Sequence, residues 1–194
     1  MAKIGLLYAG RHGQTAKIAE RIGARLRAQG HAVDVVSCPR RGEPAFELAR
    51  FDGVMVGSSV HVGRHHREID RFVRLHGHFL ASGPNAFFSV CLSARTPSPE
   101  AQRTAREPVV RTLALGPWRP KHVAIFAGAL PYTRYGWLVR WMMKRIVKAQ
   151  SGETDTMRDY EYTDWAAVDA FADAFGTEFT RKQDVAADLH PVAI

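Results

Sequence analysis

Met1–Thr15, MAKIGLLYAGRHGQT, joins an apolar run to a short basic loop and then to residues that can begin a helix. The near-continuous apolar run Ile4–Tyr8 is typical of a central parallel strand that is covered on both faces. A strand, a tight loop and a helix N-terminus together predict an anion site, because unpaired backbone N–H groups and the helix dipole favour negative charge. Arg11 adds a positive charge and Thr15 adds a hydroxyl donor, so a phosphate is the first ligand to consider.

The loop matches neither of the two common nucleotide motifs, G-x-x-x-x-G-K-[ST] and G-x-G-x-x-G. Its ending Gly13-Gln14-Thr15 fits the Gly-x-Thr ending of flavodoxin-type mononucleotide loops, whereas residues 10–12 stand where hydroxyl residues are usual. From the loop alone, two interpretations stay open. It is either a flavin mononucleotide site or a helix N-terminus that binds only water or buffer anions.

The length of 194 residues favours one well-buried domain. No run approaches the roughly 20 apolar residues that cross a bilayer, and no signal-peptide pattern precedes the first strand. Cys38 and Cys91 lie far apart in apolar contexts, which predicts two core residues and a cytoplasmic, reducing compartment. The net charge of +8 predicts an acidic partner. Because no nucleic-acid motif is present, the candidates are an anionic lipid and an anionic substrate.

Strand-like and helix-like segments alternate along the chain. The expected strands are Lys3–Ala9, Ala32–Ser37, Gly53–Gly57, Asn85–Leu92 and Lys121–Ala129. The expected helices are Gln14–Gln29, Arg64–Leu80, Glu100–Glu107 with a resumption to Leu115, and Thr163–Thr180 with Thr163 or Asp164 as its cap. This alternation predicts an α/β fold with a doubly wound parallel sheet, for which two common strand orders are open. In either order the loops Gly10–Thr15, Ser58–His66 and Ser93–Pro97 converge at the carboxyl ends of the strands.

Residues 130–162 form a segment that is too long for a plain connection, which suggests a functional insertion. It contains an expected amphipathic helix, Trp137–Ala149, with a broad apolar face. The opposite face carries the basic residues Arg140, Lys144, Arg145 and Lys148. Such a helix fits a membrane-surface element, or a helix that packs on the sheet edge while its basic face is solvated.

The chain resembles the menaquinone-dependent protoporphyrinogen IX dehydrogenases, flavodoxin-like flavoproteins of bacterial haem synthesis, over nearly all of residues 1–182. The segments that carry the resemblance are RHGQT at 11–15, GSSV at 57–60, FSVCLSAR at 88–95, WRP at 118–120, FAGAL at 126–130, YTRY at 132–135 with Trp137, SGETDT at 151–156 and YTDW at 162–165. The resemblance implies one flavodoxin-like domain over residues 1–182, with a five-stranded sheet of order 2-1-3-4-5 and an insertion at 130–162. Residues 183–194 are expected to form a flexible tail.

The resemblance also implies FMN as the cofactor, with its phosphate on residues 11–15 and its ring between the loops after strands three and four. The implied cofactor-binding residues are Arg11, His12, Gly13, Gln14, Thr15, Ser58, Ser59, Val60, His61, Ser89, Val90, Leu92, Ser93, Ala94 and Arg95. The family's loop after strand three tends to carry an aromatic residue that stacks on the flavin. Residues 61–63, His-Val-Gly, contain none, so His61, Tyr132 and Tyr135 are the candidates for covering the ring.

The implied reaction oxidises protoporphyrinogen IX to protoporphyrin IX and passes the electrons to menaquinone or ubiquinone. The implied location is the cytosolic face of the inner membrane, with peripheral attachment. Candidates for contact with substrate or with an anionic membrane surface are Tyr132, Arg134, Tyr135, Trp137, Arg140, Trp141, Lys144, Arg145 and Lys148. A homo-oligomer is compatible with the sequence. A flavodoxin-type electron carrier and an NAD(P)H:quinone reductase on the same fold are the alternatives.

Basic residues in the three converging loops predict a field that raises the reduction potential of a bound flavin. They are Arg11, His61, Arg64, His65, His66 and Arg95. No side chain stands out as a general acid or base, although the three histidines titrate near pH 7 and are expected mostly to be solvated. No cysteine or carboxylate cluster accompanies them, so no metal site is expected. Trp118 is expected to serve in packing.

Overall fold

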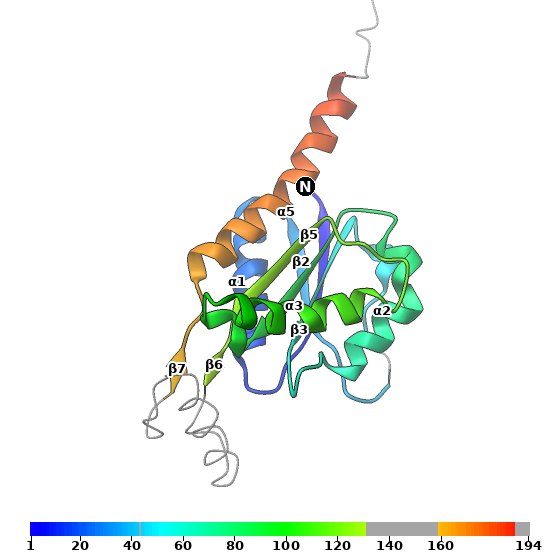
Figure 1. Cartoon of the computed structure of the whole chain (residues 1–194). Helices are drawn as coiled ribbons and strands as arrows, with labels where there is room; N and C mark the ends of the chain where they lie inside the picture. Colours follow the sequence, from blue (N-terminus) through cyan, green and yellow to red (C-terminus); the bar gives the residue numbers. More distant parts are fainter. Residues whose placement is uncertain (43, 131–158, 189–194) are drawn as a thin grey trace, which may run out of the picture.

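The computed structural model describes residues 1–42, 44–130 and 159–188, with only the backbone of residues 180–188. Its centre is a parallel sheet of five strands, β1 (Lys3–Ala9), β2 (Ala32–Ser37), β3 (Gly53–Ser59), β4 (Asn85–Cys91) and β5 (His122–Ala127). The strand order is β2-β1-β3-β4-β5, as expected for a flavodoxin-like fold (Figure 1). The order reverses at β1, so the loops after β1 and β3 flank the switch point where doubly wound sheets bind ligands.

Two further strands, β6 (Ala129–Leu130) and β7 (Tyr160–Glu161), form a separate antiparallel pair. Leu130 pairs with Tyr160, so the two ends of the intervening segment lie side by side beyond β5 (Figure 1). The predicted helix Trp137–Ala149 and the candidates from Tyr132 to Lys148 lie outside the described residues.

Among the described residues, four helices cover the sheet in two layers (Figure 1). They are α1 (Gln14–Ala28), α2 (Arg67–Leu80), α3 (Pro99–Leu113) and α5 (Trp165–Asp188), with short 3-10 turns at Leu48–Arg50 and Leu92–Arg95. Helices α1 and α5 pack on one face and α2 and α3 on the other, as the two core clusters show. This double cover explains why β1, β3 and β4 are apolar on both sides.

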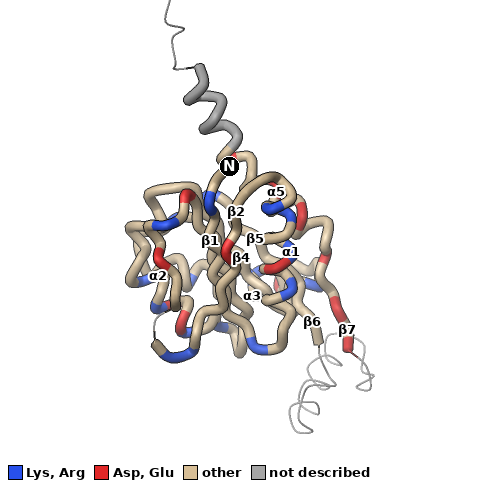
Figure 2. Tube along the Cα trace, turned by 180° about the vertical axis from the view of Figure 1, so that it is seen from behind, with Lys and Arg blue, Asp and Glu red and all other residues tan. Residues whose placement is uncertain are grey.

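Helices α1 and α5 are also joined at their solvent edge by two bidentate ion pairs. Arg21 contacts Asp169 at 2.7 and 2.6 Å, and Arg25 contacts Asp173 at 2.7 and 2.9 Å. Figure 2 shows charged residues along both helices. Because these side chains are exposed, the pairs fix the alignment of the two helices more than they add stability.

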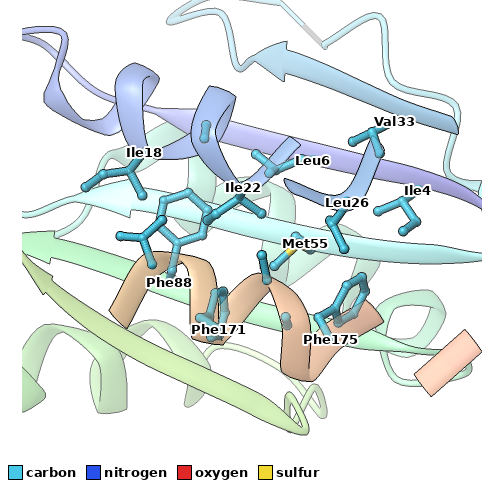
Figure 3. Close-up of a cluster of buried hydrophobic side chains, with 14 of the residues drawn as sticks. Ile4, Leu6, Ile18, Ile22, Leu26, Val33, Met55, Phe88, Phe171 and Phe175 are labelled. Carbon is cyan, nitrogen blue, oxygen red and sulfur yellow. The ribbon is translucent and has the colours of Figure 1, made fainter. Parts of the chain in front are cut away.

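The core on the α1 and α5 side is built from alternate strand residues and the inner faces of the two helices (Figure 3). Leu6, Ile22, Phe88 and Phe175 are all completely buried there. Phe88 lies opposite Gly57 in the register of β3 and β4, and a Cβ on Gly57 would be only 2.0 Å from its ring. The close approach of this ring therefore requires glycine at position 57.

The largest differences from the predicted element boundaries are in three helices. Helix α2 begins at Arg67 rather than Arg64, because residues 61–64 form a turn and His66 is extended. Helix α3 is continuous through Pro108 and starts at a cap in which Ser98 Oγ accepts from Ala101 N. Helix α5 continues past Thr180 to Asp188, and Asp164 caps its start by accepting from Ala167 N. Within the described residues, no helix is both long and apolar enough to span a bilayer.

Candidate functional site

The turn after β1 leaves the start of α1 open to an anion. Gly13 occupies the N-cap with φ of 92°, and no side chain caps the helix. The first backbone N–H groups of α1 therefore point outward without an intrahelical acceptor. No acidic residue lies in the first turn, and Arg11 beside it is exposed. This geometry suits a phosphate, as the sequence predicted.

Two residues of the predicted phosphate loop are held by the protein itself. Gln14 donates from Nε2 to Thr163 Oγ1 at 2.8 Å, and Thr163 donates to the carbonyl of Ala127 at 2.8 Å. The side chain of Gln14 thus joins α1 to the segment before α5, which leaves its backbone N–H for a ligand. Lys17 adds an ion pair to Glu161 at 2.9 Å. The start of α1 is therefore positioned by residues that follow the insertion.

The loop after β3 ends in a tight two-residue turn. His61 N donates to Arg64 O at 2.8 Å and Arg64 N donates to His61 O at 3.2 Å. The central residues Val62 and Gly63 have φ of 50° and 69°, the signs of a type I′ turn. Positive φ is strained for a β-branched residue, and strain of this kind gathers at functional sites. Val62 is 88% exposed, so an apolar side chain stands free at the tip.

Behind this turn, three side chains form a hydrogen-bonded line. Ser59 Oγ lies 3.0 Å from His66 Nε2, and His66 Nδ1 lies 3.1 Å from Glu68 Oε1. Burial lowers the pKa of His66, and the charge and hydrogen bond of Glu68 oppose that shift. A neutral imidazole held by a carboxylate can accept a proton from the Ser59 side of the line.

His65 is part of the protein interior. Its Nε2 lies 2.9 Å from Ser89 Oγ and its Nδ1 lies 2.9 Å from Thr112 Oγ1. Since Thr112 donates its own proton to Asp70 at 2.6 Å, Nδ1 must donate to Thr112, and Ser89 must donate to Nε2. Burial lowers the pKa of His65 to about 4, so it is neutral near pH 7.

The expectation that His65 and His66 are solvated cations was wrong, because both side chains are buried among hydrogen-bond partners. The pKa of His61 is also lowered, by partial burial and by Arg11. The positive charge in these loops therefore comes from the arginines.

The loop after β4 is a 3-10 turn, Leu92–Arg95, that lies beside β5 and the segment before α5. The guanidinium of Arg95 lies 5.1 Å from the ring centre of Tyr162. Arg95 Nε is buried and has no hydrogen-bond partner among the residues that the structure describes. A buried donor without an acceptor is costly, so this atom suits a ligand or water that accepts its proton.

The predicted cofactor residues do not all reach one surface. The structure brings Arg11–Thr15, Ser59–His61 and Leu92–Arg95 to the carboxyl edge of the sheet (Figure 1). Ser58, Ser89 and Val90 lie inside strands and are buried. Sequence reasoning missed Glu68, which is only two residues from His66, and Tyr162, which lies next to Arg95 only after folding.

The remaining predictions concern cysteines, Trp118 and metals. Cys38 and Cys91 are buried and free, and Trp118 is completely buried, which confirms all three as core residues. Burial raises the pKa of the Cys38 thiol to about 11. In the part of the chain that the structure describes, no group of three or more His, Cys, Asp or Glu residues could hold a metal ion.

The fold and the open turn define a flavodoxin-type protein, and a family model described as a flavodoxin domain matches residues 5–157. Protoporphyrinogen IX dehydrogenase [quinone] of Escherichia coli (strain K12) is 40% identical over 170 residues, which cover 86% of this chain and 91% of that protein. The Leishmania major protein of the same name is 35% identical over 173 residues, covering 88% and 73%. The chain belongs to the family of protoporphyrinogen IX dehydrogenases [quinone] within the flavodoxin domain proteins.

Solved structures agree on the fold. The crystal structure of oxidised flavodoxin 1 from Bacillus cereus matches with a TM-score of 0.53 over 92% of this chain and 97% of that chain. Its sequence is only 16% identical, so this likeness bears on the fold alone.

Proposed function

We propose that the chain binds FMN and oxidises protoporphyrinogen IX with a quinone as electron acceptor. The observation that carries this proposal is the 40% identity to a protein of that name over 86% of the chain. The open N-terminus of α1 supports it independently, because a phosphate-bearing cofactor requires such a site. The net charge of +8 suits an anionic substrate better than it suits a carrier of electrons between proteins.

FMN fits the residues at the carboxyl edge of the sheet. The amide groups at the start of α1 would hold its phosphate, with Arg11 and Thr15 beside them. Arg95 Nε is buried without an acceptor in the described part of the chain and would find one in a bound ligand. When bound, FMN supplies the two-electron redox chemistry. Arg11, Arg64 and Arg95 place positive charge around the site, which favours added negative charge and so a higher reduction potential.

The line from Ser59 through His66 to Glu68 would take the protons that substrate oxidation releases. Ser59 stands at the end of β3, next to the predicted ring site. Its hydroxyl would pass a proton to His66 Nε2, which lies 3.0 Å away. Glu68 would hold the imidazole of His66 in place and stabilise its charged form. The burial of His66 keeps it neutral, and therefore able to accept, near pH 7.

The insertion would provide contact with the membrane. The helix that the sequence predicts at residues 137–149 carries the residues expected to approach an anionic surface and the quinone, and Tyr132, Arg134 and Tyr135 precede it. Peripheral attachment of this kind is compatible with the lack of a spanning helix among the described residues.

An anaerobic titration tests the proposal. Protoporphyrinogen IX added to the FMN-loaded protein should bleach the flavin absorbance, and menaquinone or ubiquinone should restore it. Free FMN at the same concentration is the control for non-enzymatic reduction. If the porphyrinogen leaves the absorbance unchanged while a reduced partner protein bleaches it, the chain is an electron carrier. Bleaching by NADPH alone would make it an NAD(P)H:quinone reductase.

A further inference from the structure

A cleft of about 950 Å³ opens beside the site, on the α2 side of the sheet. Its walls are the loop after β2, the turn at residues 61–64 and residues 67–76 of α2, with Arg11 from the loop after β1. Figure 2 shows several basic residues around α2 and the neighbouring loops. The volume lies near the upper end of the range of small-molecule pockets, roughly 300–1,000 Å³.

Arginines from different parts of the chain line this cleft, among them Arg11, Arg40, Arg64, Arg67 and Arg74. All five are exposed, and among the described residues none has a carboxylate oxygen within 4.0 Å. Uncompensated guanidinium groups gathered around one hollow favour an anionic occupant, and arginine grips carboxylates with two parallel hydrogen bonds.

The two described carboxylates of the cleft wall do not neutralise these arginines. Glu68 contacts His66 at 3.1 Å, and Asp70 accepts from Thr112 at 2.6 Å. Both acids are thus engaged with the buried polar groups behind the wall. The cleft therefore presents guanidinium groups to a ligand, while these two described acids bind groups behind its wall.

The cleft also joins the predicted cofactor site. Arg11 and His61, which lie in the loops after β1 and β3, line both. Glu68, the outer end of the line from Ser59, is part of the cleft wall. A ligand anchored in the cleft would therefore lie beside the reacting centre and beside the proton acceptor.

We infer that this cleft binds the propionate groups of the tetrapyrrole substrate, an inference that rests on the proposed function. Arg67 and Arg74 are seven residues apart on α2, about 10 Å along the helix axis, so they can hold two carboxylates of one large ring. The rest of the ring then extends past His61 toward the carboxyl edge of the sheet. A membrane surface offers similar anionic groups, but a concave cleft suits a discrete ligand better than it suits a flat bilayer.

Protoporphyrin IX, the product, tests the cleft because it keeps both propionates and is stable in air. Its binding to FMN-loaded protein is measured by absorbance titration, beside its dimethyl ester, which has no free carboxylate. The variant is Arg67→Gln/Arg74→Gln. The matched control is Arg103→Gln/Arg106→Gln, which removes two exposed charges from α3 outside the cleft. KM for protoporphyrinogen IX, FMN affinity and pelleting with anionic phosphatidylglycerol vesicles are measured on all three proteins.

The cleft variant should bind protoporphyrin IX at least about tenfold more weakly than wild type, because a single lost charge-assisted contact already has an effect of this size and the variant removes two. Its KM should rise by a similar factor while its FMN affinity stays unchanged. The α3 control should behave as wild type, and the dimethyl ester should not distinguish the proteins.

Equal porphyrin affinity and equal KM in wild type and the cleft variant would overturn the inference. So would an equal loss in the α3 control, which would mean a long-range charge effect. Reduced vesicle pelleting of the cleft variant, with porphyrin binding intact, would assign the arginines to the membrane instead. If wild type fails to oxidise the porphyrinogen but still binds the porphyrin through Arg67 and Arg74, the proposed function fails and the cleft stands.

Discussion

Gly10 and Thr15 face each other across the turn after β1 so closely that a Cβ on Gly10 would lie 2.7 Å from both Cβ and Oγ1 of Thr15. Atoms this close to the backbone of α1 cannot swing away as a long side chain can. The first turn of the helix would have to move, and with it the N–H groups that the predicted phosphate requires. The close contact of Gly10 and Thr15 therefore makes ligand affinity depend on the conformation of this loop.

Gly10→Ala should weaken FMN binding by about tenfold or more, since a shift of the amide groups costs charge-assisted hydrogen bonds. Quenching of flavin fluorescence on titration into the apoprotein measures this affinity. Gly83→Ala is the matched control, because its new Cβ would have only Asp52 O nearby, at 3.7 Å. Wild-type affinity in Gly10→Ala would remove the turn from the phosphate site.

The turn at Val62 offers a separate prediction, because this residue is both strained and exposed. Val62 has φ of 50° and is 88% exposed. Its strained backbone therefore destabilises the folded apoprotein, and burial of its side chain does not compensate. Val62→Asn, a residue that tolerates positive φ, should stabilise the apoprotein by about 1 kcal/mol. Urea unfolding of the two apoproteins measures the difference.

The same substitution should weaken FMN binding if Val62 covers the flavin ring, since an apolar contact would be lost. Val123→Asn, at an exposed position in β5, controls for the loss of a surface valine. A variant that is neither more stable nor weaker in binding would show that the tip of the turn carries no functional strain.

The line from Ser59 to Glu68 predicts a particular pH profile. If His66 accepts the proton, kcat/KM should rise with pH as the imidazole becomes neutral, and His66→Gln should lower it by roughly 10²-fold and remove that rise. Glu68 raises the pKa of His66, whereas burial and the charges of Arg11 and Arg40 lower it. Glu68→Gln should therefore move the acid limb of the profile to lower pH.

FMN affinity serves as the control for these two variants, because a merely structural defect would also loosen the cofactor. An unchanged acid limb in Glu68→Gln, at normal FMN affinity, would exclude His66 as the proton acceptor. Steady-state rates with protoporphyrinogen IX between pH 5 and pH 8 are sufficient to decide.

The features that could be predicted from the sequence are those that depend on residues adjacent in the chain. The five strands follow from runs of neighbouring apolar residues, and the turn at residues 10–15 follows from its glycines. All five strands are present close to their predicted bounds. Pro108 misled the prediction of α3, because a helix can continue past one missing N–H donor when its inner face is buried.

The histidines show the limit of such reasoning. His65 meets Ser89 and Thr112, residues from β4 and α3, and no feature within the loop itself indicates that burial. The contact between Arg95 and Tyr162 likewise joins segments far apart in the sequence. By contrast, His66 and Glu68 are two residues apart at the start of a helix, so their contact was within reach of sequence analysis.

The burial of His65 makes the stability of the protein depend on pH. In the folded state its pKa is about 4, whereas in the unfolded chain it returns to about 6.5. Protons therefore bind the unfolded chain more readily between these values. The contribution of neutral His65 to stability is present above pH 6.5 and is lost progressively as the pH falls toward 4.

Between pH 7 and pH 5 this linkage amounts to about 2 kcal/mol of unfolding free energy. His65→Gln should be less stable than wild type at pH 7, because the contacts with Ser89 and Thr112 are disturbed, but it should lose about 2 kcal/mol less on acidification. Urea unfolding at the two pH values measures how much unfolding free energy each protein loses on acidification. The contributions of the other titrating groups cancel in the comparison, because the two proteins share them. The imidazole resonances of His65 give a second reading, and they should not shift above pH 5. An equal loss of unfolding free energy in the two proteins, or a His65 resonance that titrates near pH 6.5, would mean that this side chain is not buried between its two hydroxyl partners.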